Sequence, residues 1–133
     1  MVIGVDYRLA PEYPFPAPRD DGYEALNWTI TNASKYSIDP RRIGLWGISA
    51  GGNLAASVAL LDCVHHKPSR IRHLNLVVPA VCHPDLVSPE IHHENGSMRR
   101  FAMGGKDGVS NSALKRLWGK FCRTSFPHFQ REC

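Results

Sequence analysis

One stretch limits what this chain can fold into more than any other feature. In it, a short apolar run is followed by a glycine-rich corner and then by a helix-like run. Residues 43–46 are typical of a buried strand, and residues 53–61 form an Ala- and Leu-rich run typical of a helix. Between them stand Gly47, Ser49 and Gly51. Gly47 and Gly51 carry no Cβ, so the chain can close a sharp turn around the serine. The pattern predicts a strand-to-helix corner that holds the Ser49 hydroxyl away from the sheet.

The same corner predicts a nucleophilic serine. A strand, Gly-x-Ser-x-Gly and a helix in that order form the layout of a nucleophile elbow, with Ser49 as the attacking group. The first N–H groups of the helix, beginning with that of Ala50, have no partner within the helix and can stabilise a developing oxyanion. A structural glycine-rich turn and a phosphate loop are the alternatives. The phosphate loop is disfavoured because no Lys-Ser or Lys-Thr follows the glycines.

The remaining apolar segments alternate between strand-like and helix-like patterns. Residues 2–5 and 74–78 are short apolar runs typical of buried parallel strands. An acidic pair opens a helical apolar stripe over residues 20–33, and a second amphipathic stripe covers residues 114–121. Residues 8–18 carry four prolines and predict an extended loop. The order strand, helix, strand, helix, strand predicts an α/β fold, in which about three parallel strands are flanked by helices.

Composition excludes several classes of protein. The 133 residues are enough for one domain, and 43% of them are hydrophobic, as in ordinary globular proteins. The net charge of +4 comes from scattered basic residues rather than a basic face, so nucleic-acid binding has little support. No apolar run reaches the roughly 20 residues of a membrane span. The four cysteines lie far apart, which favours reduced thiols and a cytosolic protein.

The histidines do not form a recognisable metal site. His65 is adjacent to His66 and His92 to His93, and neighbouring side chains point apart on a helix or strand. Helical zinc sites use an i, i+4 spacing instead. We therefore expect neither a metal nor a cofactor.

Several side chains in the first loop have two possible roles. Asp6 follows the first predicted strand, where it is a candidate acid or a structural residue. Tyr7, Tyr13 and Phe15 are candidates for an acyl pocket, although packing within the loop is favoured.

Three stretches, taken in order, carry a family resemblance. They are Asp-Tyr-Arg-Leu-Ala-Pro-Glu at 6–12, Pro-Phe-Pro-Ala at 14–17 with the acidic pair that follows, and Ile-Asp-Pro-Arg-Arg-Ile at 38–43 leading to Gly-Ile-Ser-Ala-Gly-Gly-Asn at 47–53. Together they resemble the hormone-sensitive-lipase-like branch of the α/β-hydrolases, which are carboxylesterases and lipases. The resemblance is strong over residues 1–85 and looser over 86–123, while 124–133 match nothing.

The resemblance implies a Ser-His-Asp triad that hydrolyses small carboxylic esters. Ser49 matches the nucleophile, and the backbone N–H of Ala50 matches one oxyanion donor. The acyl-enzyme formed on the serine would then be hydrolysed by water. A catalytically dead relative, or a fragment that serves as a ligand-binding or scaffold module, is the alternative.

Other parts of the family pattern have no match. The family's His-Gly-Gly motif does not precede Asp6, and the position before the serine is Ile48 rather than an acid. Asp85 and Asp107 do not fit the family's acidic segment, and His128 follows no predicted strand. We therefore expect a partial hydrolase domain whose triad acid and histidine are not identified.

Overall fold

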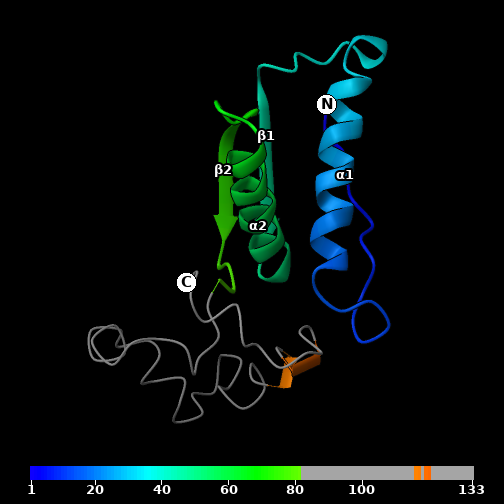
Figure 1. Cartoon of the computed structure of the whole chain (residues 1–133), viewed down its shortest axis with the longest axis vertical. Helices are drawn as coiled ribbons and strands as arrows, with labels where there is room; N and C mark the ends of the chain where they lie inside the picture. The colour runs from blue at the N-terminus through cyan, green and yellow to red at the C-terminus, as the bar shows by residue number, and fades with distance from the viewer. Residues whose placement is uncertain (82–115, 118, 121–133) are drawn as a thin grey trace, which may run out of the picture. The chain divides into compact units, whose positions relative to one another are not determined.

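The computed structural model describes residues 1–81, 116–117 and 119–120. The chain divides into two compact units, residues 1–81 and 82–133, and the sheet with its flanking helices belongs to the first. The elements of this first unit are helix α1 (Ala17–Thr31), a short 3-10 helix η1 (Ser34–Tyr36), strand β1 (Ile43–Ile48), helix α2 (Ala50–His65) and strand β2 (Ile71–Val77), as Figure 1 shows. No helix in the described residues has both the length and the apolar content that crossing a bilayer requires.

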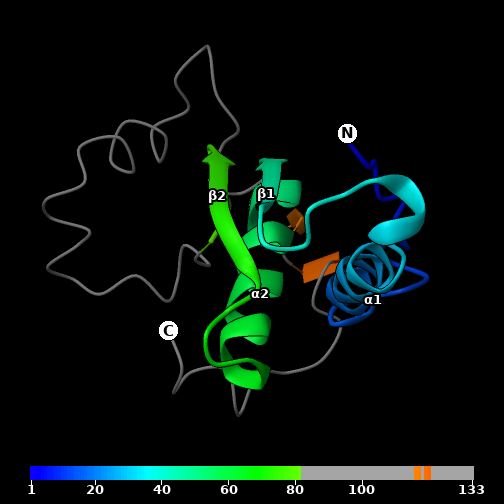
Figure 2. The same cartoon turned by 90° about the horizontal axis from the view of Figure 1, so that it is seen from above.

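The two strands form a parallel sheet. Ile43 pairs with Ile71 at one end of the register, and Ile48 pairs with Val77 at the other. Helix α2 is the crossover between the strands and packs against both of them (Figure 2). This arrangement confirms the predicted α/β fold with a parallel sheet and flanking helices.

The strand predicted at residues 2–5 is not formed, and this expectation was wrong. Within residues 1–81, no backbone hydrogen bond joins this segment to either strand. A strand is completed by a second backbone about 4.8 Å away, and the segment has none. Val2 is 96% exposed, so the predicted burial is also absent. The described sheet therefore has two strands, where about three were expected.

The core lies between α1, α2 and β1. Leu26, Ile43 and Val58 are buried together, one from each element. The apolar stripe predicted for the first helix is confirmed, since Tyr23 and Ile30 also pack against this cluster. Each fully buried side chain of this size contributes about 1.5–3 kcal/mol. The core therefore fixes α1 and α2 against the strand that leads to the Ser49 corner.

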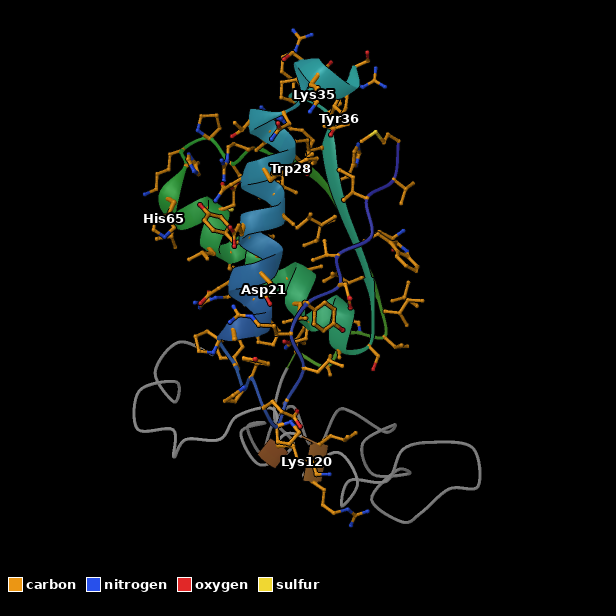
Figure 3. The ribbon with its side chains drawn as sticks, turned by 90° about the vertical axis from the view of Figure 1, so that its right-hand side faces the viewer. Asp21, Trp28, Lys35, Tyr36, His65 and Lys120 are labelled. Atoms are coloured by element: carbon orange, nitrogen blue, oxygen red, sulfur yellow. The ribbon has the colours of Figure 1, made fainter. Side chains whose placement is uncertain are left out.

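Trp28 lies off that stripe and packs near the end of α1. Its ring centroid is 5.4 Å from that of Tyr36 in η1, and the Lys35 ammonium lies 5.4 Å from the Tyr36 ring (Figure 3). Trp28 therefore gives this helix a second contact face, toward the 3-10 turn that follows it.

The first helix begins earlier than the acidic pair indicated. It starts at Ala17, and Pro18 occupies its first turn. A proline there loses no helical hydrogen bond, because the first N–H groups of a helix are unpaired in any case. The proline-rich segment therefore ends as helix rather than as extended loop.

A bidentate ion pair fastens the loop to this helix. The Arg8 side chain donates from Nε and Nη2 to Asp21, and the Arg8 backbone N–H donates to the same carboxylate at 2.9 Å. The side-chain hydrogen bond from Arg8 lowers the pKa of Asp21, and the backbone hydrogen bond adds to this effect. The segment before α1 is thus tied to the helix after it.

A buried ion pair joins α2 to the turn that leads into β2. Asp62 is fully buried, and it accepts hydrogen bonds from Ser69 Oγ at 2.8 Å and from the Arg70 backbone N–H and Nε at 2.8 and 2.7 Å. Burial raises the pKa of Asp62, but the hydrogen bonds from Ser69 and Arg70 outweigh it and lower that pKa overall. Arg70 Nη2 also donates to Asn27 Oδ1 of α1 at 3.0 Å. Through Arg70, this buried carboxylate links α2 to α1 and to the turn before β2.

Candidate active site

Ser49 occupies the corner between β1 and α2. Its backbone has φ 53° and ψ −115°, between the last strand residue and the first helical one. A positive φ is uncommon for any residue with a Cβ and costs about 1–3 kcal/mol. The side chain is exposed. The structure therefore contains the strained strand-to-helix corner that the sequence predicted.

Gly47 is sterically required at this corner. A Cβ on residue 47 would overlap the carbonyl group of Gly51 and would lie 2.7 Å from the amide nitrogen of Gly52. These neighbours are backbone atoms, so no side-chain movement relieves the overlap. The close approach expected across the corner is present, with Gly47 as the residue that permits it.

Gly51 differs from the expectation that it must lack a Cβ. A Cβ there would meet no atom within 4 Å. Gly52 is the tighter position, because its Cβ would lie 3.1 Å from Pro79 Cβ and 3.2 Å from the Gly47 carbonyl oxygen. Crowding arises where the chain after β2 crosses the start of α2, and the Gly-x-Ser-x-Gly spacing does not reveal that crossing.

Hydrogen bonds hold the Ser49 backbone on both sides. Its N–H donates to the Val77 carbonyl at 2.9 Å, and its carbonyl accepts from Asn53 N–H at 3.0 Å and Ala80 N–H at 3.4 Å. Its side chain makes no capping hydrogen bond to α2. The backbone is fixed while the hydroxyl is left free of the helix. The N–H of Ala50, the first residue of α2, belongs to the unpaired first turn.

Asn53 clamps the segment after β2 to this corner, a role that spacing alone did not suggest. Its Nδ2 donates to the Ala80 carbonyl at 2.7 Å. Its Oδ1 is buried without a hydrogen-bond partner among the described residues. The clamp and the Ala80 N–H bond to Ser49 close a small ring of contacts around the turn.

The loop aromatics are engaged in packing. The Arg8 guanidinium lies 5.3 Å from the centroid of the Tyr13 ring, and Arg19 lies 5.2 Å from that of Phe15. These contacts match the packing role that was favoured for both rings. Tyr7 is partly buried and lines an open groove of about 890 Å³ that also borders β1, while Asp6 is exposed.

The structure describes only some of the histidines and acids that the sequence analysis weighed. His65 packs against the Tyr23 ring, with centroids 5.9 Å apart, and the described residues hold no group of three potential metal ligands. Cys63 is an exposed free thiol. Five further residues lie outside the described residues: Asp85, His92, His93, Asp107 and His128.

Comparison with known proteins identifies the family. A family model described as the α/β-hydrolase fold matches residues 1–124. The chain belongs to this family. Arylacetamide deacetylase of Oryctolagus cuniculus is 38% identical over 125 residues, which are 91% of this chain and 29% of that protein. The carboxylesterase NlhH of Mycobacterium tuberculosis is 52% identical over 61 residues, which are 46% of this chain and 19% of that protein.

A solved structure gives the same result for this hydrolase chain. A thermophilic, thermostable carboxylesterase cloned from a metagenomic library superposes with a TM-score of 0.77 at 31% identity. The match covers 90% of this chain and 38% of the carboxylesterase. The chain thus spans well under half the length of the proteins it resembles.

Proposed function

We propose that this hydrolase sequence supplies the nucleophile of a carboxylic ester hydrolase, with Ser49 forming the acyl-enzyme. The observation that carries the proposal is the positive φ of Ser49 at an exposed strand-to-helix corner, with the hydroxyl not used as a helix cap. Strain of this kind concentrates at functional sites. The esterases among the relatives support an ester as the substrate.

The chemistry proceeds in two steps. Ser49 Oγ forms a bond to the ester carbonyl carbon while a histidine base takes its proton, and the tetrahedral oxyanion is stabilised by donors that include the Ala50 N–H. The C–O bond to the alcohol then breaks, and the alcohol leaves with that proton. Water adds to the acyl carbon in the second step and releases the acid and the free serine.

The experiment compares variants of the natural protein that carries this sequence. We expect Ser49→Ala to reduce hydrolysis of p-nitrophenyl butyrate by at least about 10³-fold and to abolish fluorophosphonate labelling. Ser34→Ala, an exposed serine in η1, should leave both unchanged. Hydrolysis that persists in the Ser49→Ala variant would contradict the proposal.

A non-catalytic relative is the second candidate. Within residues 1–81, no histidine or carboxylate is hydrogen-bonded to the Ser49 hydroxyl. A serine without its base reacts poorly with fluorophosphonates. Wild-type protein that neither hydrolyses the ester nor becomes labelled would replace the hydrolase proposal with a ligand-binding or scaffold role.

A further inference from the structure

The carbonyl group of Ser49 is held by two donors from different parts of the chain. Asn53 N–H, one turn along α2, donates to it at 3.0 Å, and Ala80 N–H, from the segment after β2, donates at 3.4 Å. The two parts meet because the end of β2 lies beside the start of α2 (Figure 1). One hydrogen bond leaves a peptide unit able to rotate about the line between its Cα atoms, whereas two donors restrict that rotation.

This carbonyl shares a rigid unit with the proposed oxyanion donor. The Ser49 C=O and the Ala50 N–H belong to one planar trans peptide, in which the two groups point in opposite directions. A contact that fixes the direction of the Ser49 carbonyl therefore also fixes the direction of the Ala50 N–H. Such a donor is effective when it already points to the place where negative charge develops.

The Asn53 side chain holds the second donor in place. Its Nδ2 donates to the Ala80 carbonyl at 2.7 Å, while the N–H of Ala80 reaches Ser49. Val78, two residues earlier, has φ 43°, which is unfavourable for a β-branched residue, so local preference does not keep the segment here. Among residues 1–81, these two hydrogen bonds tie Ala80 to the corner.

We propose that Asn53 is a positioning residue for the oxyanion donor. Through Ala80 it fixes the Ser49 carbonyl, and through the shared peptide plane it aims the Ala50 N–H. The inference rests on the proposed ester hydrolysis and adds to it a residue that acts through the backbone of others. Because the oxyanion forms only on the way through the tetrahedral intermediate, loss of this aim should lower kcat and leave substrate binding nearly unchanged.

Asn53→Asp tests the inference, because it removes the donor without changing the size of the side chain. A carboxylate has acceptors only, so it repels the Ala80 carbonyl instead of holding it. In the natural protein that carries this sequence, kcat for p-nitrophenyl butyrate should fall about tenfold or more, with KM changed by less than about twofold. Asn53→Ala, which deletes the donor without adding a charge, should show the same division between kcat and KM.

Asn32→Asp is the matched control. Asn32 Nδ2 also donates to a backbone carbonyl, that of Trp28 at 2.9 Å, but it does so at the end of α1. This variant should keep the wild-type kcat and KM. Each variant is assayed below the onset of its unfolding transition, followed by circular dichroism, so that lost activity is not lost folded protein. An equal fall of kcat in Asn32→Asp and Asn53→Asp would overturn the inference.

A transition-state analogue separates aiming from general loosening. When an alkyl trifluoromethyl ketone binds, the Ser49 oxygen bonds to its carbonyl carbon, the carbonyl electron pair moves onto oxygen, and the serine proton passes to the base. In Asn53→Asp the Ki of this ketone should rise by about the factor by which kcat/KM falls. The matching ketone without fluorine binds without the adduct, and its Ki should change by less than about twofold. An unchanged Ki for the trifluoromethyl ketone would overturn the inference.

The same measurements distinguish this inference from the proposed function. A wild type that does not hydrolyse the ester would overturn the proposed function and this inference with it. An active wild type whose kcat is matched by Asn53→Asp and Asn53→Ala would overturn this inference alone.

Discussion

At the scale of single residues, the Ser49 corner depends on backbone atoms that approach one another closely. Gly47 is the position where a methyl group has no room, and Gly51 is a position where one has space. Both glycines belong to the same sequence pattern, so the pattern alone assigns them equal weight. The structure separates them because a Cβ on Gly47 would overlap the first turn of α2, whereas a Cβ on Gly51 would meet open space.

This difference gives a paired prediction. Gly47→Ala should lower the free energy of unfolding by about 2 kcal/mol or more, because the overlap is with backbone and the corner must open. Gly51→Ala should be neutral or stabilising by up to about 1 kcal/mol, since alanine favours the helix. Urea denaturation followed by circular dichroism measures both. Equal destabilisation by the two alanines would show that the corner is not closed around Gly47.

Asp62 gives a prediction of the same kind for the buried ion pair. Asp62→Ala should cost about 3–5 kcal/mol, because the Arg70 guanidinium then loses its buried partner. Glu24→Ala, at an exposed site, should change stability by less than about 0.5 kcal/mol. A cost for Asp62→Ala as small as that of Glu24→Ala would contradict the network.

The pH dependence of stability follows from the same carboxylate. Its pKa in the folded chain is lowered from the ordinary value of 3.8, so the folded state favours the ionised form. The resulting stabilisation is fully present above that ordinary pKa and is lost as pH falls below it through the folded pKa. Wild type should therefore lose more stability than Asp62→Asn between neutral pH and pH 3, measured from urea midpoints. Parallel losses would contradict the lowered pKa.

At the scale of elements, the contacts around the corner connect α2 to the chain that follows β2. Asn53 holds the Ala80 carbonyl, and the Ala80 N–H reaches the Ser49 carbonyl. Val78 lies in the same segment with φ 43°, a conformation that is strained for a β-branched residue. The clamp therefore helps to hold the strained segment after β2 beside Ser49.

Removing the Asn53 hydrogen bond should increase local opening of the segment after β2 more than it lowers the free energy of unfolding of the domain. Asn53→Ala deletes one hydrogen bond but also removes a buried oxygen that has no partner in the described chain, so the net cost should be about 1 kcal/mol. The Ala80 amide should exchange hydrogen about tenfold faster in this variant. Asn32→Ala, which removes a local bond to the Trp28 carbonyl, should leave that exchange rate unchanged. Unchanged exchange in Asn53→Ala would rule out the clamp.

The sequence predicts the elements that carry their own periodicity. The β1 and β2 runs and the apolar stripe of α1 were identified, with ends that differ by a few residues because caps and turns decide them. The run at residues 2–5 was misassigned as a strand. Its β-branched residues indicate only a preference for extended backbone, and a strand also needs a neighbouring backbone with which to pair. The Asp62 network was missed, although one acid within an otherwise apolar helix is a signal that a partner exists.

At the scale of the whole molecule, the candidate site was predictable only in part. The Ser49 corner is local and could be predicted from spacing, whereas a triad is assembled from residues distant in sequence. The groove beside β1 was not foreseen, because it arises from the distance between two segments and no single stretch encodes it. The assignment of residues 1–133 as one partial hydrolase domain remains a prediction.

The Arg8 to Asp21 ion pair has a consequence for the segment that precedes it. Because the pair fastens this part of the chain to α1 rather than to the sheet, the course of residues 1–8 depends on the position of the helix.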